Sequence, residues 1–225
     1  MDTDQDYTTF NSCVTRVDAR KKTLLLWGDS HAAHLYPGYQ AVFSDKFNIV
    51  QRTASGCPPI INMEIGRRPN CKKINDYVIS EIGRLRPDKV VLAAHWQEYE
   101  WKQIDASIIQ LRKIGIASID VVGPVPQWNE TLPSQMYLYF KSDPLHRVPD
   151  RMEFGLDRTF LQVDVAMSQF VNKLGVNYLS PAGLLCNEAG CITRFGETSD
   201  SLSAWDDAHL TSIGSIKLVS QFPKD

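Results

Sequence analysis

The chain has 225 residues, of which 43% are hydrophobic and 22% charged, and its formal net charge at pH 7 is −2. These values are ordinary for a soluble globular protein, and the length is sufficient for one sizeable hydrophobic core. A net charge so close to zero gives no indication of a nucleic-acid partner, and no apolar run approaches the roughly 20 residues that cross a bilayer.

The start of the chain, MDTDQDYTTFNSC, is polar and acidic and lacks the apolar segment of a signal peptide. It predicts a cut made inside a longer protein. We therefore expect this part to be soluble, and any targeting or membrane segment of the parent protein to lie outside it.

Apolar runs alternate with segments of helical periodicity along the chain. The run KTLLLWG (22–28) predicts a fully buried strand, and the helix expected after it must bend or restart at Pro37 and Gly38. Pro87 ends the second predicted helix, and Gly115 closes the third. The predicted strands, in chain order, are 22–28, 47–52, 88–96, 116–124 and 176–181. The predicted helices are 31–44, 72–86, 104–115 and 158–175, with a last one inside 204–222. Irregular segments are expected at 54–71, at 125–157 and around Cys186 and Cys191.

Strands that are apolar along their whole length and alternate with helices predict an α/β fold. We expect a three-layer sandwich, in which a central, mostly parallel sheet of about five strands is covered by helices on both faces. The sequence shows no internal repeat and no low-complexity linker. Residues 1–225 are therefore expected to form a single domain.

The five cysteines indicate the redox compartment. Cys57 and Cys71 bracket a loop rich in proline and glycine, and Cys186 and Cys191 flank the polar turn NEAG. None of these four lies in the periodic apolar faces where free cysteines are usually buried, so disulfides and an oxidising compartment are predicted over free thiols in the cytosol. The spacing also lacks the two-plus-two ligand pattern of a zinc site. Cys13 is left over, and its partner could lie upstream of this chain.

Polar residues follow two of the predicted strands. Gly28, Asp29 and Ser30 come directly after the first strand, and His95 and Trp96 stand at the end of the third. In parallel α/β sheets, ligands bind beyond the carboxyl ends of the strands. A serine that begins a helix there has an exposed hydroxyl and backbone N–H groups nearby. To act as a nucleophile, it needs a base and a third group that orients the base.

The stretch WDDAHLT near the C-terminus offers both groups. Asp206 and His209 are three residues apart, so in a helical turn they share one face, and the carboxylate can orient an imidazole whose Nε2 faces Ser30. Asp207 is the rival for this role, but adjacent side chains diverge, and we expect it to cap the final helix or meet solvent. A serine at a strand end is often only a helix cap, and a lone DxxH is often only surface. Their combination favours a Ser-His-Asp triad.

With GDSH after the first strand and DDAHLT before the last helix, the chain resembles the SGNH (GDSL-type) hydrolase superfamily over nearly its whole length. GDSHA, the CPP after the second strand, the late cysteine pair and D..HLT..G resemble, more particularly, the SGNH domains attached to acyltransferase-3 membrane proteins. Those domains act in the periplasmic O-acetylation of bacterial surface glycans such as lipopolysaccharide O-antigen.

The resemblance implies serine-dependent acetyl transfer onto a glycan hydroxyl, through Ser30, His209 and Asp206. It also implies that the acyltransferase-3 domain of a membrane-anchored parent protein delivers the acyl group in the periplasm. No metal and no cofactor are expected.

The middle motifs depart from the family's pattern. SGNH enzymes bind the oxyanion with the serine N–H, a glycine after the second strand and an asparagine in a GxND motif after the third. Gly56 in TASGCPP matches the glycine, whereas LAAHW places His95 where the asparagine is expected. A histidine can donate one hydrogen bond, and loss of an oxyanion donor costs on the order of 10²–10³ in rate. Either His95 substitutes, or the site is a slow esterase, or it is tuned for something other than hydrolysis.

Further residues are candidates for ligand contact. We expect Asp29, His31 and Trp96 to bind substrate, although His95 and Trp96 could instead only pack. His31 and His34, beside Asp29, could alternatively be metal ligands. Aromatic residues near the strand ends and in the long loop are expected mostly in the core or at its rim, while exposed ones could stack on sugar rings. These aromatic residues are Trp96, Tyr99, Trp101, Trp128, Tyr137 and Tyr139.

Three other functions compete with acetyl transfer. The first is a carbohydrate acetylesterase of the same fold, in which water replaces the sugar as acceptor. The second is a metal-dependent phosphoesterase, which would need further Asp, Asn and His motifs that the sequence lacks. The third is a glycan-binding module on a decayed hydrolase fold, which the altered third motif favours and the intact Ser30, Asp206 and His209 oppose. No GxSxG occurs, which argues against an α/β-hydrolase elbow.

Overall fold

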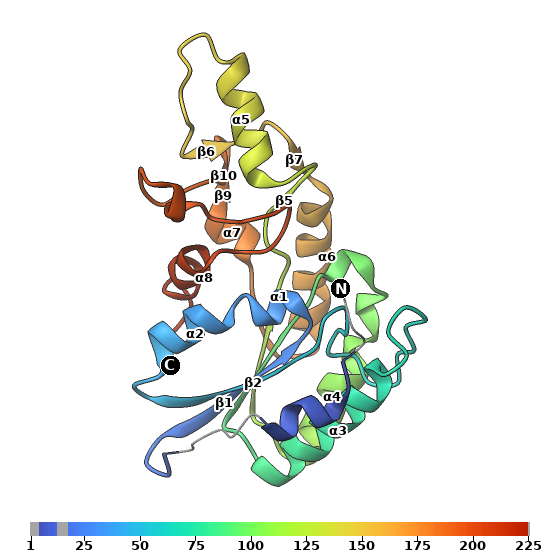
Figure 1. Ribbon diagram of the computed structural model, residues 1–225. Helices are drawn as coiled ribbons and strands as arrows, with labels where there is room; N and C mark the ends of the chain where they lie inside the picture. Colours follow the sequence, from blue (N-terminus) through green and yellow to red (C-terminus); the bar gives the residue numbers. More distant parts are fainter. Residues whose placement is uncertain (1–4, 13–17, 225) are drawn as a thin grey trace.

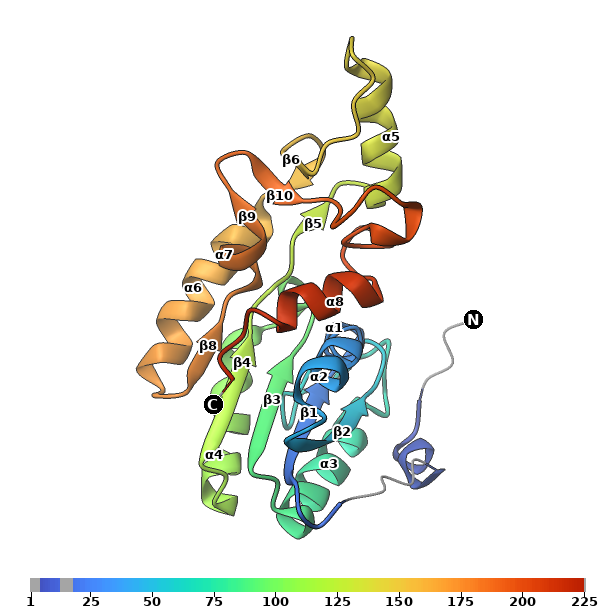
Figure 2. The same ribbon diagram turned by 90° about the vertical axis from the view of Figure 1, so that its left-hand side faces the viewer.

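The centre of the molecule, drawn in Figure 1, is a five-stranded sheet. Its strand order is β2-β1-β3-β4-β8, with every neighbouring pair parallel, and all five strands are labelled in Figure 2. This computed structural model describes residues 5–12 and 18–224, so Cys13 lies outside the described residues. The strands are β1 (Lys22–Gly28), β2 (Phe47–Thr53), β3 (Lys89–Ala93), β4 (Ser118–Val122) and β8 (Asn177–Leu179). The predicted parallel α/β sheet is confirmed.

Helices cover both faces of the sheet, because alternate side chains of each strand are apolar on both sides. Leu24 and Leu26 of β1 point to one face, and Leu25 and Trp27 point to the other. The first face packs against α1 (Ser30–Ala33), α2 (Tyr36–Phe43) and α8 (Ser212–Val219), as Figure 2 shows. The second packs against α3 (Cys71–Leu85), α4 (Ile104–Ile114) and α6 (Thr159–Lys173).

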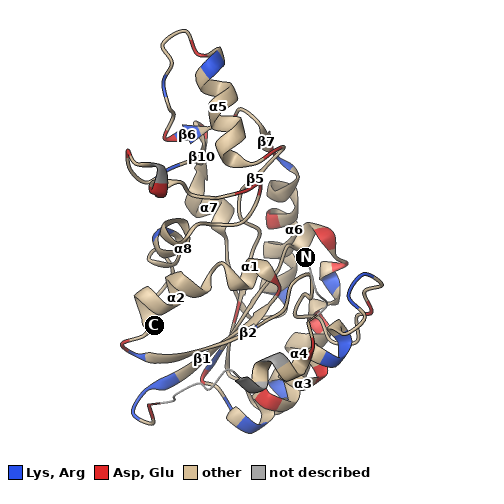
Figure 3. Ribbon diagram, viewed as in Figure 1, with Lys and Arg blue, Asp and Glu red and all other residues tan. Residues whose placement is uncertain are grey.

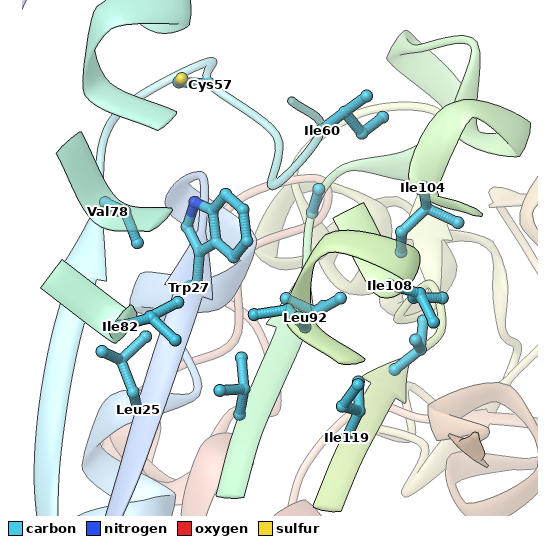
Figure 4. Packing of buried hydrophobic residues seen from close by; sticks show 14 of the residues in the cluster. Leu25, Trp27, Cys57, Ile60, Val78, Ile82, Leu92, Ile104, Ile108 and Ile119 are labelled. Atoms are coloured by element: carbon cyan, nitrogen blue, oxygen red, sulfur yellow. The ribbon is translucent and has the colours of Figure 1, made fainter. Parts of the chain in front are cut away.

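Trp27 anchors the second core (Figure 4). Its indole N–H donates to Oδ1 of the buried Asn75, at 3.0 Å, and the Asn75 amide donates to the carbonyls of Pro58 and Ile60. The Cys57–Cys71 disulfide, now confirmed, fixes the same loop to the start of α3. A long loop that lacks regular structure is therefore tied to the core where it passes the end of the sheet.

The segment 125–157 was expected to be irregular, and this prediction is wrong. It contains α5 (Leu132–Ser142) and three short strands, β5 (Gln127–Trp128), β6 (Arg151–Met152) and β7 (Leu156–Asp157). Thr131 caps α5 by accepting the N–H of Ser134, and the helix buries Leu132 and Met136 in a third, smaller core. A helix whose apolar residues Met136–Phe140 form a continuous run, and which has a proline in its first turn, gives little periodic signal.

The loop around the late cysteines is a hairpin rather than irregular chain. After α7 (Pro181–Leu185), β9 (Cys186–Asn187) pairs with β10 (Gly190–Ile192), and β10 also pairs with β6. The predicted Cys186–Cys191 disulfide is confirmed and joins β9 to β10.

The third strand was also predicted too long. It ends at Ala93, and the chain then turns into a short 3-10 helix, Trp96–Glu98. The other 3-10 helices are Tyr7–Ser12, Trp101–Gln103 and Ser199–Ser201. Of the helices in the described residues, none has both the length and the hydropathy for a membrane crossing.

Candidate active site

The candidate site lies at the carboxyl edge of the sheet, where the strand order reverses. β1 lies between β2 and β3. The chain passes from β1 to β2 on one side of it and then crosses to β3 on the other side. Open parallel sheets bind ligands in the crevice at such a switch point. Ser30 follows β1 there, and His95 follows the neighbouring β3.

Asp29 holds the ends of these two strands together. Its Oδ1 accepts the N–H of His31 at 2.8 Å, which caps α1, and its Oδ2 accepts the N–H of His95 and the hydroxyl of Tyr99, both at 3.0 Å. Before it, Gly28 lies so close to β3 that a Cβ would overlap the carbonyl oxygen of Ala93. Burial raises the pKa of the Asp29 carboxyl, and these hydrogen bonds oppose the rise.

Ser30, His209 and Asp206 form one hydrogen-bonded chain. Ser30 Oγ lies 2.8 Å from His209 Nε2, and His209 Nδ1 lies 2.8 Å from Asp206 Oδ2. Asp206 Oδ1 accepts the backbone N–H groups of Ala208 and His209, at 3.0 and 2.6 Å. The segment is thus a turn held by the aspartate side chain, not the helical turn that the spacing predicted. A hydroxyl, a base and an orienting carboxylate in this order are the parts of a nucleophilic site.

Neighbouring backbone bonds hold the loop that carries Asp206 and His209. The carbonyls of Asp206 and Asp207 accept the N–H groups of Leu132 and Trp128, at 3.0 and 2.9 Å. The Asp207 side chain is exposed, and it is Thr211 that caps α8, by accepting the N–H of Gly214. Asp207 is thus exposed to solvent, as expected, but it does not cap the last helix.

A hollow of about 450 Å³ opens beside Ser30, and Gly56 and His95 line it as well. The three residues predicted to bind an oxyanion therefore border one space. Gly56 has a φ of 63°, a left-handed conformation that favours glycine, and within the described part of the chain its N–H donates to no acceptor. On the His95 ring, Nε2 contacts the side-chain Nε2 of Gln127, a neighbour that the sequence analysis did not predict.

Four imidazoles, including the His209 ring that contacts Ser30, pack against one another. The ring of His31 lies 4.9, 4.5 and 4.7 Å from the rings of His34, His95 and His209. Burial, together with repulsion from the neighbouring imidazoles, lowers the pKa of both His31 and His34 well below the usual value. Both are therefore neutral at pH 7. In residues 5–12 and 18–224, no group of three or more His, Cys, Asp or Glu side chains is arranged to hold a metal ion.

The predicted substrate contacts of this region lie deep in the fold. Trp96 is 0% exposed, and its indole N–H donates to the carbonyl of Val122 at 2.8 Å. Asp29 is 1% exposed and His31 4%. Trp96 has no free surface for a ligand, so we assign it to packing. The burial of Asp29 and His31 favours roles in positioning Ser30 and its neighbours.

Trp205 is an aromatic residue of the site that the sequence analysis missed. Its indole stacks on the His209 ring, with 5.5 Å between ring centroids and 24° between planes, and its side chain is exposed. The feature of the sequence that could have identified Trp205 is its position directly before Asp206. The helices beside the site, α1 and α2, carry no Lys, Arg, Asp or Glu, as the tan ribbon in Figure 3 shows.

The neutral imidazoles of the buried His31 and the half-buried His34 predict acid sensitivity of the fold. In the unfolded chain each gains a proton as the pH falls through about 6.5, while in the folded chain each stays neutral to lower pH. The contribution of these two histidines to the free energy of unfolding is thus fully present above pH ~6.5. It is lost as the pH falls from there toward the pKa values that the two imidazoles have in the folded chain. Two protons correspond to a loss of up to about 2.7 kcal/mol in the free energy of unfolding per pH unit.

Urea unfolding between roughly pH 7 and 5 checks this expectation. His31→Phe should reduce the pH slope by up to half, because it removes one of the two protons. His146→Ala, which removes an exposed histidine, should leave the slope unchanged. The raised pKa of Asp29 acts in the opposite sense, so the comparison of slopes between variants is decisive. Equal slopes in the wild type and His31→Phe would contradict the assignment.

Comparison with known proteins identifies a family and similar solved structures. A family model described as the SGNH domain (fused to AT3 domains) matches residues 2–224. The chain is similar to the periplasmic domain of the lipopolysaccharide acetyltransferase of Salmonella ser. Paratyphi A, with a TM-score of 0.80 and 29% identity over 90% of this chain and 82% of that one. Another solved chain has a TM-score of 0.49 and 12% identity over 88% and 94%. A search of curated proteins finds no match.

Proposed function

Because the chain belongs to the family of SGNH domains that are fused to AT3 domains, we propose that it is an acyltransferase acting through Ser30, His209 and Asp206. The resemblance inferred from the GDSH and DDAHLT motifs is thereby confirmed at the level of the family. The continuous hydrogen bonding from Ser30 Oγ through the imidazole to Asp206 carries the proposal. The residues bring a nucleophile, its base and the orienting carboxylate together from positions 179 apart in sequence.

In the first half of the proposed reaction, Ser30 Oγ attacks the acyl carbonyl of the donor while His209 Nε2 takes the hydroxyl proton. The donor oxygen then leaves with that proton, and the acyl group is esterified to Ser30. Asp206 keeps the proton of neutral His209 on Nδ1, so that Nε2 is free to accept, and it stabilises the imidazolium. Oxyanion stabilisation falls to the N–H groups of Ser30 and Gly56 and to the His95 ring, which border the same hollow.

In the second half, an acceptor hydroxyl gives its proton to His209 and its oxygen attacks the acyl carbon. Ser30 Oγ leaves and recovers the proton. We propose that the acceptor is a surface glycan and the acyl group acetyl, since the structural neighbour is a lipopolysaccharide acetyltransferase domain. Lipopolysaccharide O-antigen is the specific acceptor that the motifs favour. With water as acceptor, the same site is an acetylesterase.

The proposed setting is the periplasm. Both disulfides fit an oxidising compartment, and the neighbour is a periplasmic domain. The family description favours an AT3 membrane domain as the partner that supplies the acyl group, and hence a membrane-anchored parent protein. Within that parent, we propose that residues 1–225 form one catalytic domain.

The proposal is tested with p-nitrophenyl acetate as donor, with and without sugar acceptors. Release of p-nitrophenol measures acylation, and mass analysis of the sugars separates transfer from hydrolysis. Transfer predicts acetylated sugar that depends on Ser30. Release of p-nitrophenol without any acetylated sugar favours the esterase, and activity that is equal in Ser30→Ala contradicts both.

The Cys186–Cys191 disulfide is expected to contribute more to the rate of acyl transfer than to the stability of the fold. The hairpin it closes adjoins the segment that leads to Asp206, since Ser203 bonds to the carbonyls of Ile192 and Thr193, both at 2.8 Å. A loop closed over five positions contributes less than the ~3 kcal/mol of a 15-residue loop, whereas a misplacement of ~1 Å in a catalytic group costs ~10²-fold in rate.

The double variant Cys186→Ser with Cys191→Ser should therefore lose acyl transfer by about tenfold or more with only a small loss in Tm. Cys57→Ser with Cys71→Ser is the matched comparison. Its separation of 14 positions predicts the larger loss of Tm. A Cys186/Cys191 variant with an unchanged rate and a much lower Tm contradicts the expectation.

A further inference from the structure

The indole of Trp205 is an exposed aromatic surface in contact with the candidate triad. The side chain is 61% exposed while its ring stacks on His209. By contrast, Trp27, Trp96 and Trp128 are at most 4% exposed. Leaving so large an apolar side chain in water forgoes much of the ~25 cal/mol per Å² that burial contributes. What distinguishes Trp205 from other exposed apolar side chains is its contact with His209, which makes the indole a surface on which a ligand of the site can stack.

Hydrogen bonds fix the backbone segment that carries this indole. The N–H of Trp205 donates to the carbonyl of His209 at 3.1 Å, and Ala204 and Leu210 pair on either side of the turn. The carbonyl of Asp206 accepts the N–H of Leu132 at the start of α5. The backbone position from which the indole projects is therefore fixed before a ligand binds, which lowers the entropic cost of binding.

Two separate surfaces flank the Ser30–His209 pair. The hollow beside Gly56 and His95 includes Arg67 and Tyr99 in its lining but not Trp205. The indole lies against the imidazole instead. A transferase must place two molecules at one nucleophile in turn, and this arrangement supplies a surface for each.

We infer that Trp205 binds the acceptor, by stacking on the apolar face of a pyranose ring whose hydroxyl reaches His209 Nε2. The inference rests on the proposed function, in which His209 takes the proton of the acceptor hydroxyl. For that step the hydroxyl oxygen must come within ~2.6–3.2 Å of Nε2. A sugar ring has C–H groups on its faces and hydroxyls on its edge. One face of the indole lies against the imidazole, so the sugar covers the opposite, exposed face, and an edge hydroxyl extends past the rim of the indole toward His209 Nε2.

Binding is measured in the Ser30→Ala chain, so that no turnover occurs. The ¹⁵N-labelled protein is titrated with methyl pyranosides of galactose, mannose, rhamnose and glucose, with glycerol as the acyclic control. The indole N–H signal of Trp205 is identified by its absence in Trp205→Phe. At least one pyranoside should shift this signal saturably, and glycerol should not.

Replacing Trp205 by Ala in this background should weaken binding by about tenfold or more, as measured by the His209 signals, because the stacking surface is lost. Trp205→Phe keeps a planar ring and should lose less. Phe154→Ala, which removes another exposed aromatic side chain, 43% exposed and in contact with Tyr139, should not change the affinity. If the indole only steadies the imidazole, Trp205→Ala will leave pyranoside affinity unaltered, and the inference fails.

The same inference fails if no pyranoside shifts the Trp205 signal saturably while Ser30-dependent turnover of p-nitrophenyl acetate is intact. A chain that binds pyranosides at Trp205 but shows no Ser30-dependent turnover would instead overturn the proposed function and leave the sugar site standing. The two failures are thus distinguishable.

Discussion

Ser30→Ala and His209→Ala are each expected to lower turnover of p-nitrophenyl acetate by ~10³-fold or more, and the double variant is expected to lose little beyond either single one. The reason is that the two side chains perform one step: the hydroxyl is a poor nucleophile unless the imidazole 2.8 Å away takes its proton. Whatever activity remains comes from the hollow and its hydrogen-bond donors alone.

The measurement is steady-state release of p-nitrophenol at pH 7, with thermal unfolding to show that each variant is folded. Ser44→Ala, a similarly half-buried serine at the end of α2, is the matched control and should keep the wild-type rate. Effects of Ser30→Ala and His209→Ala that multiply in the double variant would show two independent contributions and would contradict the triad.

Asp206→Asn is expected to lower the rate by about 10³–10⁴-fold, although it is nearly isosteric. An asparagine oxygen can still accept the backbone N–H groups of Ala208 and His209, so the turn is kept. Its NH₂ group then faces His209 Nδ1 and requires that nitrogen to accept. The ring proton moves to Nε2, where it blocks acceptance of the Ser30 proton.

The neighbouring carboxylate tests which of the two aspartates orients the imidazole. Asp207→Asn is the matched control, since this neighbour is exposed, and its rate should stay within about twofold of the wild type. A large loss in Asp207→Asn with little change in Asp206→Asn would reverse the assignment.

The sheet could be predicted because its strands are covered on both faces. Such strands appear in the sequence as continuous apolar runs, of which LLLW in β1 and VVLA in β3 are examples. The run at 88–96 exceeds β3 because Trp96 is as buried as the strand, although its backbone has already turned. Burial alone therefore did not locate the strand's end.

The short elements of 125–157 and 181–192 could not be predicted for the opposite reason. α5 buries few residues, and β9 and β10 pair over two or three residues across a disulfide. Their stability comes from contacts with distant segments, as in the pairing of β10 with β6. Local periodicity carries almost none of that information.

The candidate triad could be predicted because two short motifs occur together, one after the first strand and one before the last helix, although each motif alone has a common structural explanation. Trp205 and Gln127 could not be assigned in this way. Trp205 reaches His209 only through the turn at 204–210, and Gln127 meets His95 only through the placement of β5. Gln127 approaches His95 from another segment of the chain, so it leaves no signal in the spacing of the third motif.

The most direct measurement of the central claim is the location of the acyl group during turnover. The chain is mixed with p-nitrophenyl acetate, quenched in acid and digested, and the peptides are mapped by mass. An acyl-enzyme predicts an added mass of about 42 Da on the peptide that contains Ser30, absent in Ser30→Ala and lost on further incubation. Acetylation found only on other residues, or turnover of Ser30→Ala at the wild-type rate, would contradict the account.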